Sequence, residues 1–126
     1  MVRQVFTIPK YHWKHYYVEE IIERLYSIGC PTDYIDDAYN NMVSDKLNTG
    51  LTYSNNRYRS SVIVISDTSN PAQFMNSYDH ERQHLINHIL EAFNINPKGE
   101  EAAYLSGKIG QLMFPKAKYF LCECHY

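Results

Sequence analysis

The sequence contains little that would place the chain outside the ordinary soluble globular proteins. Its 126 residues carry 12 Lys and Arg against 14 Asp and Glu, a formal net charge of -2, so charge alone does not nominate nucleic acid as a partner. The longest purely aliphatic run, Val62 to Ile65, is far shorter than the roughly 20 apolar residues that span a bilayer. The N-terminus lacks the apolar stretch of a signal peptide, so we expect a cytoplasmic protein with neither a nucleic-acid nor a membrane partner.

Cysteine is also scarce. Cys30, Cys122 and Cys124 form an odd set, and two of them are separated by a single residue, which is a poor basis for a secreted disulfide framework. We therefore expect reduced thiols. Together with His125, the last two cysteines could suggest a second metal cluster, but ligand pairs in structural zinc sites are usually two to four residues apart. We expect this tail to pack its apolar residues instead.

The length predicts one domain, residues 1–126, of the α+β class. Hydrophobic periodicity and turn residues predict the elements. In chain order, they are a strand or extended arm (Val2 to Ile8), a helix from Val18 to Gly29, a helix capped by Thr32 (Asp33 to about Val43), two strands flanking a polar loop (Asn55 to Arg59), a long helix starting at Pro71 after a cap at Ser69 or Asn70 and ending near Phe93, and a helix from Glu100 to Pro115.

The long helix carries His80-Glu81-Arg82-Gln83-His84. Histidines four apart lie one turn above each other on the same helix face, so both imidazoles can bind one ion at about 2.0–2.1 Å. Glu81 is rotated by about 100° from His80, so it can take a proton from a water at the metal but cannot comfortably be a ligand. The pattern predicts a hydrolytic zinc site. The alternative is that both histidines are solvated polar residues of a surface helix.

A third ligand is expected from the following helix. Residues 94–99 span at most about 20 Å, and His84 lies about 14 Å back from the helix end, so the chain can return to the metal. Glu100 is the first choice and Glu101 the second, because only one of two adjacent helical residues can face the ion. Either can instead be part of an acidic first turn that interacts favourably with the helix dipole.

Two other side chains near the motif have competing interpretations. Tyr104 stands one turn after Glu100, so its hydroxyl can donate to the oxyanion that forms on a carbonyl under attack, although a packing role is equally available to it. His88 continues the histidine ladder, but its Cα lies about 12 Å along the axis from His80. It is therefore expected to support the site or to be a satisfied core residue. We expect Val62 to Ile65, a β-branched strand, to align an extended substrate.

Four segments together resemble the small predicted metallopeptidases of prophages and mobile elements in gut Bacteroidetes: Asn48 to Asn55, Ser61 to Ile65, His80 to Leu85 and Gly99 to Leu105. The likeness covers about the last two-thirds of the chain. More distantly, the motif helix followed by a glutamate helix looks like the minimal gluzincins, including the ImmA/IrrE type that acts on repressors. The resemblance implies a zincin-like fold, a zinc ion held by His80, His84 and Glu100, and Glu81 as general base. Related gluzincins commonly have Asp or Asn where this chain has Tyr104.

The sequence thus predicts zinc-dependent hydrolysis of a peptide or protein substrate, with Glu81 activating the water. The alternative from a different class is a non-catalytic protein-binding module of a phage or mobile element that keeps zinc for stability. An open metal position distinguishes the first from the second, since a structural site is closed by protein ligands.

Overall fold

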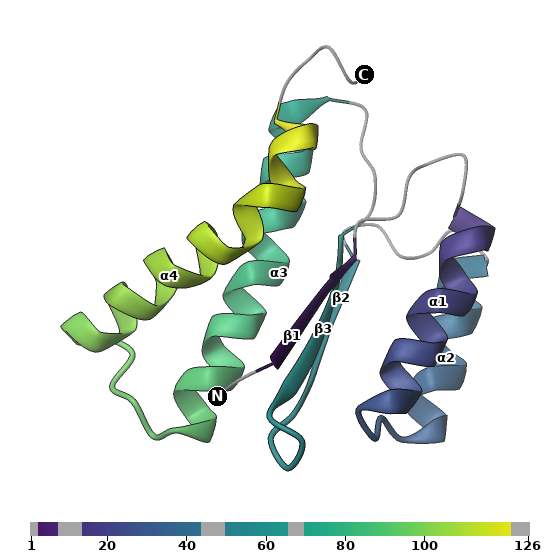
Figure 1. Cartoon of the computed structure of the whole chain (residues 1–126), viewed down its shortest axis with the longest axis horizontal. Coiled ribbons are helices and arrows are strands. Elements are labelled where there is room, and N and C mark those ends of the chain that lie inside the picture. Colours follow the sequence, from purple (N-terminus) through teal and green to yellow (C-terminus); the bar gives the residue numbers. More distant parts are fainter. Residues whose placement is uncertain (1–2, 8–13, 44–49, 66–69, 122–126) are drawn as a thin grey trace.

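A computed structural model describes residues 3–7, 14–43, 50–65 and 70–121 of the chain, and in it a small sheet lies between two layers of helices (Figure 1). The strands are β1 (Arg3–Thr7), β2 (Gly50–Asn55) and β3 (Ser60–Ile65). The helices are α1 (Lys14–Ser27), α2 (Thr32–Val43), α3 (Pro71–Ala92) and α4 (Glu100–Ala117), and a 3-10 turn, η2 (Lys118–Phe120), follows α4. The α+β class is confirmed.

The three strands are arranged in the order β1-β3-β2, with β3 parallel to β1 and antiparallel to β2. The hairpin expected around residues 55–59 is present, and the early strand is part of the same sheet. Gly50 opens β2 with a φ of 132°, and a Cβ there would collide with the main-chain oxygen of Val64. Only glycine therefore allows β2 to begin in such close pairing with β3.

The central position of β3 corrects one expectation. All six of its residues are buried, and both of its edges are paired with neighbouring strands. The expectation that Val62 to Ile65 align a substrate is therefore wrong, because a strand with two partners has no main-chain groups left for a peptide. β2 has a single partner among the described strands, so on that side of the sheet the available edge belongs to β2.

One layer of helices, α1 and α2, packs on the sheet face that carries Val62 and Val64. Each helix turns one apolar stripe inward, as the 3.6-residue period requires. The buried members are Val18, Ile21 and Leu25 of α1 and Ile35, Ala38 and Met42 of α2. Gly29, with a φ of 78°, follows the end of α1 where the sequence predicted a stop.

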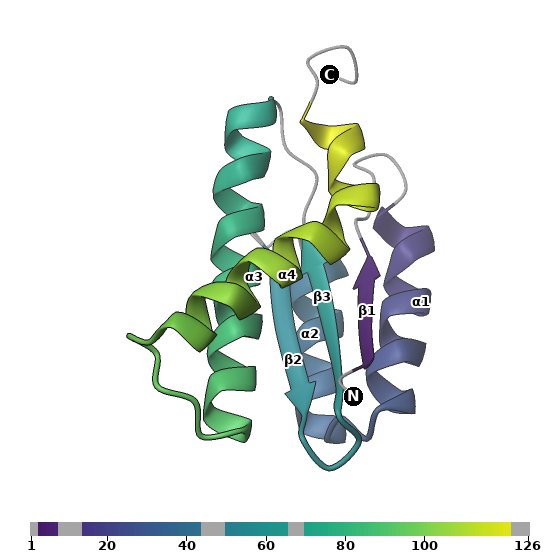
Figure 2. The same ribbon diagram turned by 60° about the vertical axis from the view of Figure 1, so that its left-hand side comes forward.

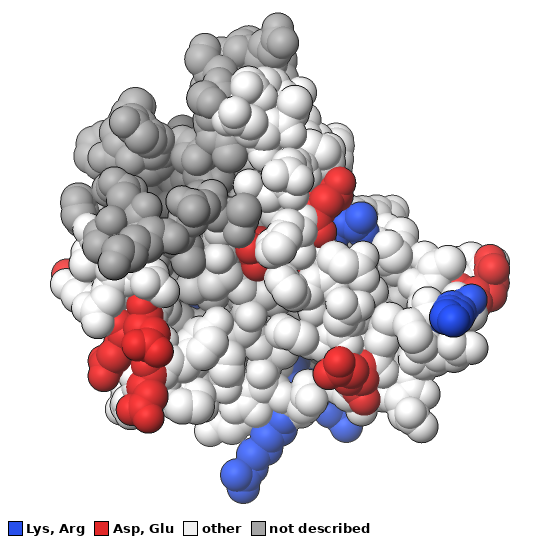
Figure 3. Space-filling model, turned by 180° about the vertical axis from the view of Figure 1, so that it is seen from behind, with Lys and Arg blue, Asp and Glu red and all other residues white. Residues whose placement is uncertain are grey.

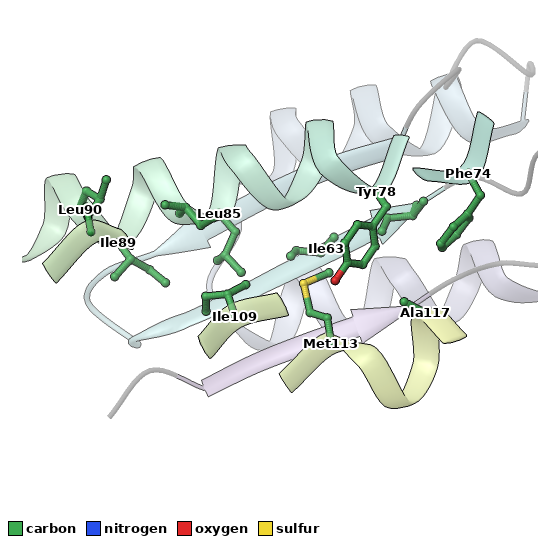
Figure 4. Close-up of a cluster of buried hydrophobic side chains, with 12 residues drawn as sticks. Ile63, Phe74, Tyr78, Leu85, Ile89, Leu90, Ile109, Met113 and Ala117 are labelled. Atoms are coloured by element: carbon green, nitrogen blue, oxygen red, sulfur yellow. The ribbon is translucent and has the colours of Figure 1, made fainter. Parts of the chain in front are cut away.

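The other layer, α3 and α4, packs on the face that carries Ile63 and Ile65 (Figures 1 and 2). Asn70 caps α3, since its Oδ1 accepts a hydrogen bond from the Gln73 N–H at 2.9 Å, and Pro71 occupies the first position of the helix. This confirms the predicted start. Figure 4 shows the buried cluster that β3, α3 and α4 form together; the labelled side chains are Ile63 of β3, Phe74, Tyr78, Leu85, Ile89 and Leu90 of α3, and Ile109, Met113 and Ala117 of α4.

The end of α4 differs from the prediction. Pro115 was expected to stop the helix, yet α4 continues through it to Ala117. A proline in the last turn removes only one main-chain hydrogen bond, and the helix is held beyond it by Ala117, which is buried in the core. Phe120 of η2 then stacks on Phe74 at a ring-centroid distance of 4.9 Å. Within the described ranges no helix combines the length and apolar character needed to cross a bilayer.

Candidate metal centre

The two motif histidines point toward a common position on α3. The Nε2 atoms of His80 and His84 are 3.3 Å apart, within reach of a hydrogen bond between the rings, and the ring centroids are 4.8 Å apart. Two imidazole nitrogens that share a tetrahedral zinc ion at about 2.0–2.1 Å are separated by about 3.3–3.4 Å. Both residues are exposed, and 54% of the His80 side chain is accessible. The pair therefore fits a divalent cation at a position open to solvent.

Glu81 enters the helix–sheet interface beside this pair. Its side chain is only 3% exposed, and the Thr52 hydroxyl donates to its Oε1 at 2.9 Å. The same hydroxyl lies 3.1 Å from the Glu81 main-chain oxygen. The other carboxylate oxygen, Oε2, is 3.9 Å from Nε2 of His80. The carboxylate is thus held from the side of β2 and directs one oxygen toward the histidine pair, where a general base is needed.

Helix α4 packs on α3 away from the histidines. Besides the apolar packing between the two helices, Arg82 of α3 contacts α4, since its Nη1 donates to the main-chain oxygen and the hydroxyl of Ser106, each at 3.1 Å. Arg82 follows His80 by two residues and so points about 200° away from it around the helix axis. The charged side chain at this position of the motif therefore fastens α4 to the opposite side of α3, and the Arg82 guanidinium also lies 3.6 Å from the Asp79 carboxylate.

The structure does not bring the expected third ligand to the pair. Glu100, Glu101 and Tyr104 are exposed, and 74% of Tyr104 is accessible. On α4 the buried residues Ala102 and Ile109 face α3, whereas Glu100 and Tyr104 lie on the outer side of the helix. Within residues 3–7, 14–43, 50–65 and 70–121, no three His, Cys, Asp or Glu side chains form a metal-binding group. The ligand role of Glu100 and the oxyanion role of Tyr104 stay predictions.

A second polar contact crosses the same interface one turn further along α3. Nδ1 of His88 is 2.7 Å from the Ser54 hydroxyl, which is itself 2.7 Å from the Ser61 hydroxyl. Burial lowers the pKa of His88, the neighbouring His84 lowers it further, and Glu91 opposes both effects. His88 is therefore a half-buried ring that is positioned by β2, as a supporting or satisfied core residue would be.

The charge of Glu81 also affects the pKa of Tyr34. Burial raises the pKa of Tyr34 in α2, and the charges of Cys30, Glu81 and Tyr53 add to the rise in that order. The Tyr34 ring also packs on that of Tyr53 in β2, with centroids 5.1 Å apart. Tyr34 thus packs with Tyr53 on the α1–α2 side of the sheet, and it is not assigned to the site.

Sequence reasoning missed the contribution of β2. Thr52 and Ser54 point to α3, while Leu51 and Tyr53 point to α1 and α2. This alternation is visible in the sequence as polar residues at every second position, but it looks the same when the polar side faces solvent. The packing of α3 over the polar side is what makes these hydroxyls part of the site.

The remaining candidates and the comparisons add no further assignment. Cys122, Cys124 and His125 lie outside the described residues, so the expectation for the C-terminal cluster stays a prediction. No protein-family model, curated protein or solved structure matches the chain. The geometry around His80, Glu81 and His84 is therefore the main indication of function.

Proposed function

We propose that the protein is a zinc-dependent peptidase of zincin-like type, in which His80 and His84 bind the metal and Glu81 is the general base. The observation that carries the proposal is the 3.3 Å separation of the two Nε2 atoms beside a buried carboxylate oxygen. When bound there, zinc would polarise the substrate carbonyl and acidify a water. The donor set suits this ion, since neutral imidazoles are among its preferred ligands.

Glu81 moves the proton in this mechanism. Its Oε2 accepts a proton from the attacking water, and the same oxygen returns it to the leaving amine nitrogen as the peptide bond breaks. Thr52 donates to Oε1, and Oε2 is the oxygen that faces His80, at 3.9 Å from its Nε2. Because the carboxylate is almost fully buried, water does not compete for its orientation.

The substrate is expected to lie along β2. An extended peptide can add to the edge of a sheet through main-chain hydrogen bonds, and β2 has one edge that no described strand occupies. The residue of β2 that contacts Glu81 is Thr52, so a peptide on this edge passes directly beside the proposed base. This arrangement favours a peptide over a small-molecule substrate.

The non-catalytic alternative requires a metal that is enclosed by protein and that stabilises the fold. The exposure of His80 and His84 supports the open, hydrolytic site instead. One measurement, the stability of the metal-free protein, distinguishes the two proposals. Removal of zinc with a chelator is expected to leave a folded protein with a somewhat lower thermal unfolding midpoint if the site is open on the surface, whereas removal of a structural zinc would unfold the protein.

The decisive experiment compares wild type with Glu81→Gln. Zinc content is measured on the purified proteins, and cleavage of a mixed peptide library is followed by mass spectrometry. We expect one zinc ion per chain in both proteins and a fall in kcat of about 10²- to 10⁴-fold in the variant. Equal cleavage by the two proteins, or wild type that binds no zinc, would overturn the proposal.

Two matched variants complete the experiment. Glu91→Gln makes the same chemical change on an exposed residue of the same helix and is expected to leave cleavage unchanged. Glu100→Gln tests the ligand that the sequence predicted. With α4 packed as described, it is expected to retain zinc, and a loss of zinc would show that α4 rearranges when the ion binds.

A further inference from the structure

A pocket of about 190 Å³ lies next to the proposed site, between the end of α3 and the β2–β3 turn. One of its walls is apolar and consists of Ile89, Ala92 and Phe93. Phe93 is 51% exposed, so this wall has an aromatic ring that is not covered by other parts of the described chain. An apolar wall of this size suits the hydrocarbon part of one amino-acid residue.

The opposite wall is polar. It includes Ser54 and Ser61, and His88 lies between the two walls. The hydrogen bonds from Ser61 to Ser54 and on to His88, each 2.7 Å long, fix these groups in place. Fixed hydroxyl and imidazole groups at the side of an apolar pocket are the usual means of orienting a ligand. The pocket is thus bounded by side chains of α3, β2 and β3 as well as by the β2–β3 turn.

The turn supplies the charge. Arg59 and Asn56 line the pocket, and the Arg59 side chain forms no ion pair with another described residue. Arg59 has a φ of 50°, in the left-handed region that non-glycine residues rarely adopt. Figure 3 shows basic side chains at the end of the molecule where the β2–β3 turn lies. Among the described residues, no Asp or Glu lines the pocket, and Glu91, which acts on His88, lies outside the lining.

The pocket lies at a defined distance along β2 from the proposed base, Glu81. Thr52 contacts Glu81, and Ser54, two residues further along the same strand, contacts His88 at the pocket. Side chains two apart on a strand point to the same face and are separated by about 6.6–6.8 Å. A peptide that lies along β2 with its scissile bond at Glu81 therefore places a residue about two positions away at the pocket.

We propose that this pocket is a substrate subsite that binds a carboxylate, from an acidic side chain or from the peptide's free C-terminus, about two residues from the bond that is cut. Arg59 supplies the charge, and Asn56 and the Ser54–His88 pair are the neutral groups beside it. The position of the pocket relative to the bond that is cut rests on the proposed function. The pocket's preference for a carboxylate is independent of catalysis, and binding alone tests it.

The test uses the zinc-loaded Glu81→Gln protein, labelled with ¹⁵N, so that bound peptides are not turned over. Two matched pairs of acetylated tetrapeptides are titrated: Ala-Ala-Phe-Ala as free acid and as amide, and Ala-Ala-Glu-Ala against Ala-Ala-Gln-Ala, both as amides. Amide shifts are followed at Ser54, Ser61 and Phe93. We expect at least one carboxylate peptide to bind about tenfold more tightly than its neutral match, the effect of one charge-assisted contact. The pair that discriminates identifies the source of the carboxylate.

The control variants exchange one arginine each in the same turn. Arg59→Gln is expected to reduce the discrimination to less than about twofold, and Arg57→Gln, which changes an exposed arginine outside the pocket lining, is expected to retain it. Equal binding within both pairs, discrimination that survives Arg59→Gln, or shifts that miss the pocket would each overturn the subsite. If the protein prefers carboxylate peptides but the wild type cleaves no peptide, the subsite is supported and the peptidase proposal is refuted. If the wild type cleaves peptides but the protein shows no carboxylate preference, the peptidase proposal is supported and the subsite is refuted.

Discussion

The two faces of the sheet are built from different chemistry. On the face covered by α1 and α2, the buried side chains of β3 include Val62 and Val64, and the helices add an apolar layer. On the other face, Thr52 and Ser54 of β2 meet Glu81 and His88 of α3 inside the interface. Polar groups buried between a helix and a sheet stabilise less than apolar packing does and are costly when a partner is missing. Their concentration on one face supports the proposal that the chemistry lies there, whereas apolar packing stabilises both faces.

The largest expected effect is on the metal. Replacing His84 by Ala is expected to weaken zinc binding by more than about 100-fold, beyond the 10–100-fold seen when only an outer contact is lost. His88→Asn removes a histidine of the same helix that is held by Ser54 and is expected to retain zinc within about tenfold. Competition with a chromophoric chelator measures both constants. Similar losses in the two variants would mean that the ladder of histidines, and not the 80–84 pair, holds the ion.

The next effect compares the two cores directly. Leu25 of α1 and Leu85 of α3 are both fully buried, on opposite faces of the sheet. Each change to Ala is expected to lower the free energy of unfolding by about 2–5 kcal/mol in urea titrations. Only Leu85→Ala, which loosens the helix next to His84, is expected to weaken zinc binding as well. If Leu25→Ala has the same effect on zinc, the two layers are coupled and the division proposed here fails.

A smaller effect is expected at the contact between β2 and the base. Thr52→Val removes the hydroxyl that donates to Glu81 and leaves a buried carboxylate with one donor fewer, a loss of about 1–3 kcal/mol. We expect kcat to fall about tenfold with little change in KM. Thr52→Ser keeps the hydroxyl and serves as the control. A Val variant with wild-type kcat would show that Glu81 is oriented by its other contacts.

A further comparison tests whether the α1–α2 face is chemically inert. Burial raises the pKa of Cys30 from 9.0 to about 11, so at pH 8 its reactive thiolate is about 100-fold less populated than that of an exposed cysteine. In a Cys122→Ser, Cys124→Ser background, we expect alkylation of Cys30 by iodoacetamide to be slower in the folded than in the unfolded protein by at least this factor. Rapid alkylation of the folded protein would show that this core opens.

The same shift has a consequence for stability. The pKa is higher in the folded state, so the contribution of Cys30 is fully present below pH 9 and is lost as the pH rises toward 11. Burial of Tyr34, Tyr53 and Tyr78 raises their pKa values and acts in the same direction. We therefore expect the free energy of unfolding to fall with pH on the alkaline side, and urea titrations from pH 8 to 11 would measure it.

Local signals in the sequence predicted much of the fold. The cap at Asn70 with Pro71, the stop at Gly29 and the start at Glu100 all depend on a few neighbouring residues, and all three are present. The central place of β3 was not predictable, because a buried strand has the same composition whether it lies at the edge or in the middle of a sheet. The continuation of α4 past Pro115 also depends on a distant partner, the core that receives Ala117.

The sequence by itself determined the spacing of His80, Glu81 and His84 on one helix, because residues four apart lie on the same face of any α-helix. Only the tertiary structure decided what surrounds them. It placed Thr52 against the carboxylate, turned Glu100 outward and used Arg82 to hold α4 on the far side of α3. These contacts depend on how helices and strands that are distant in the sequence pack together. A local sequence pattern contains no information about which distant element will pack on it.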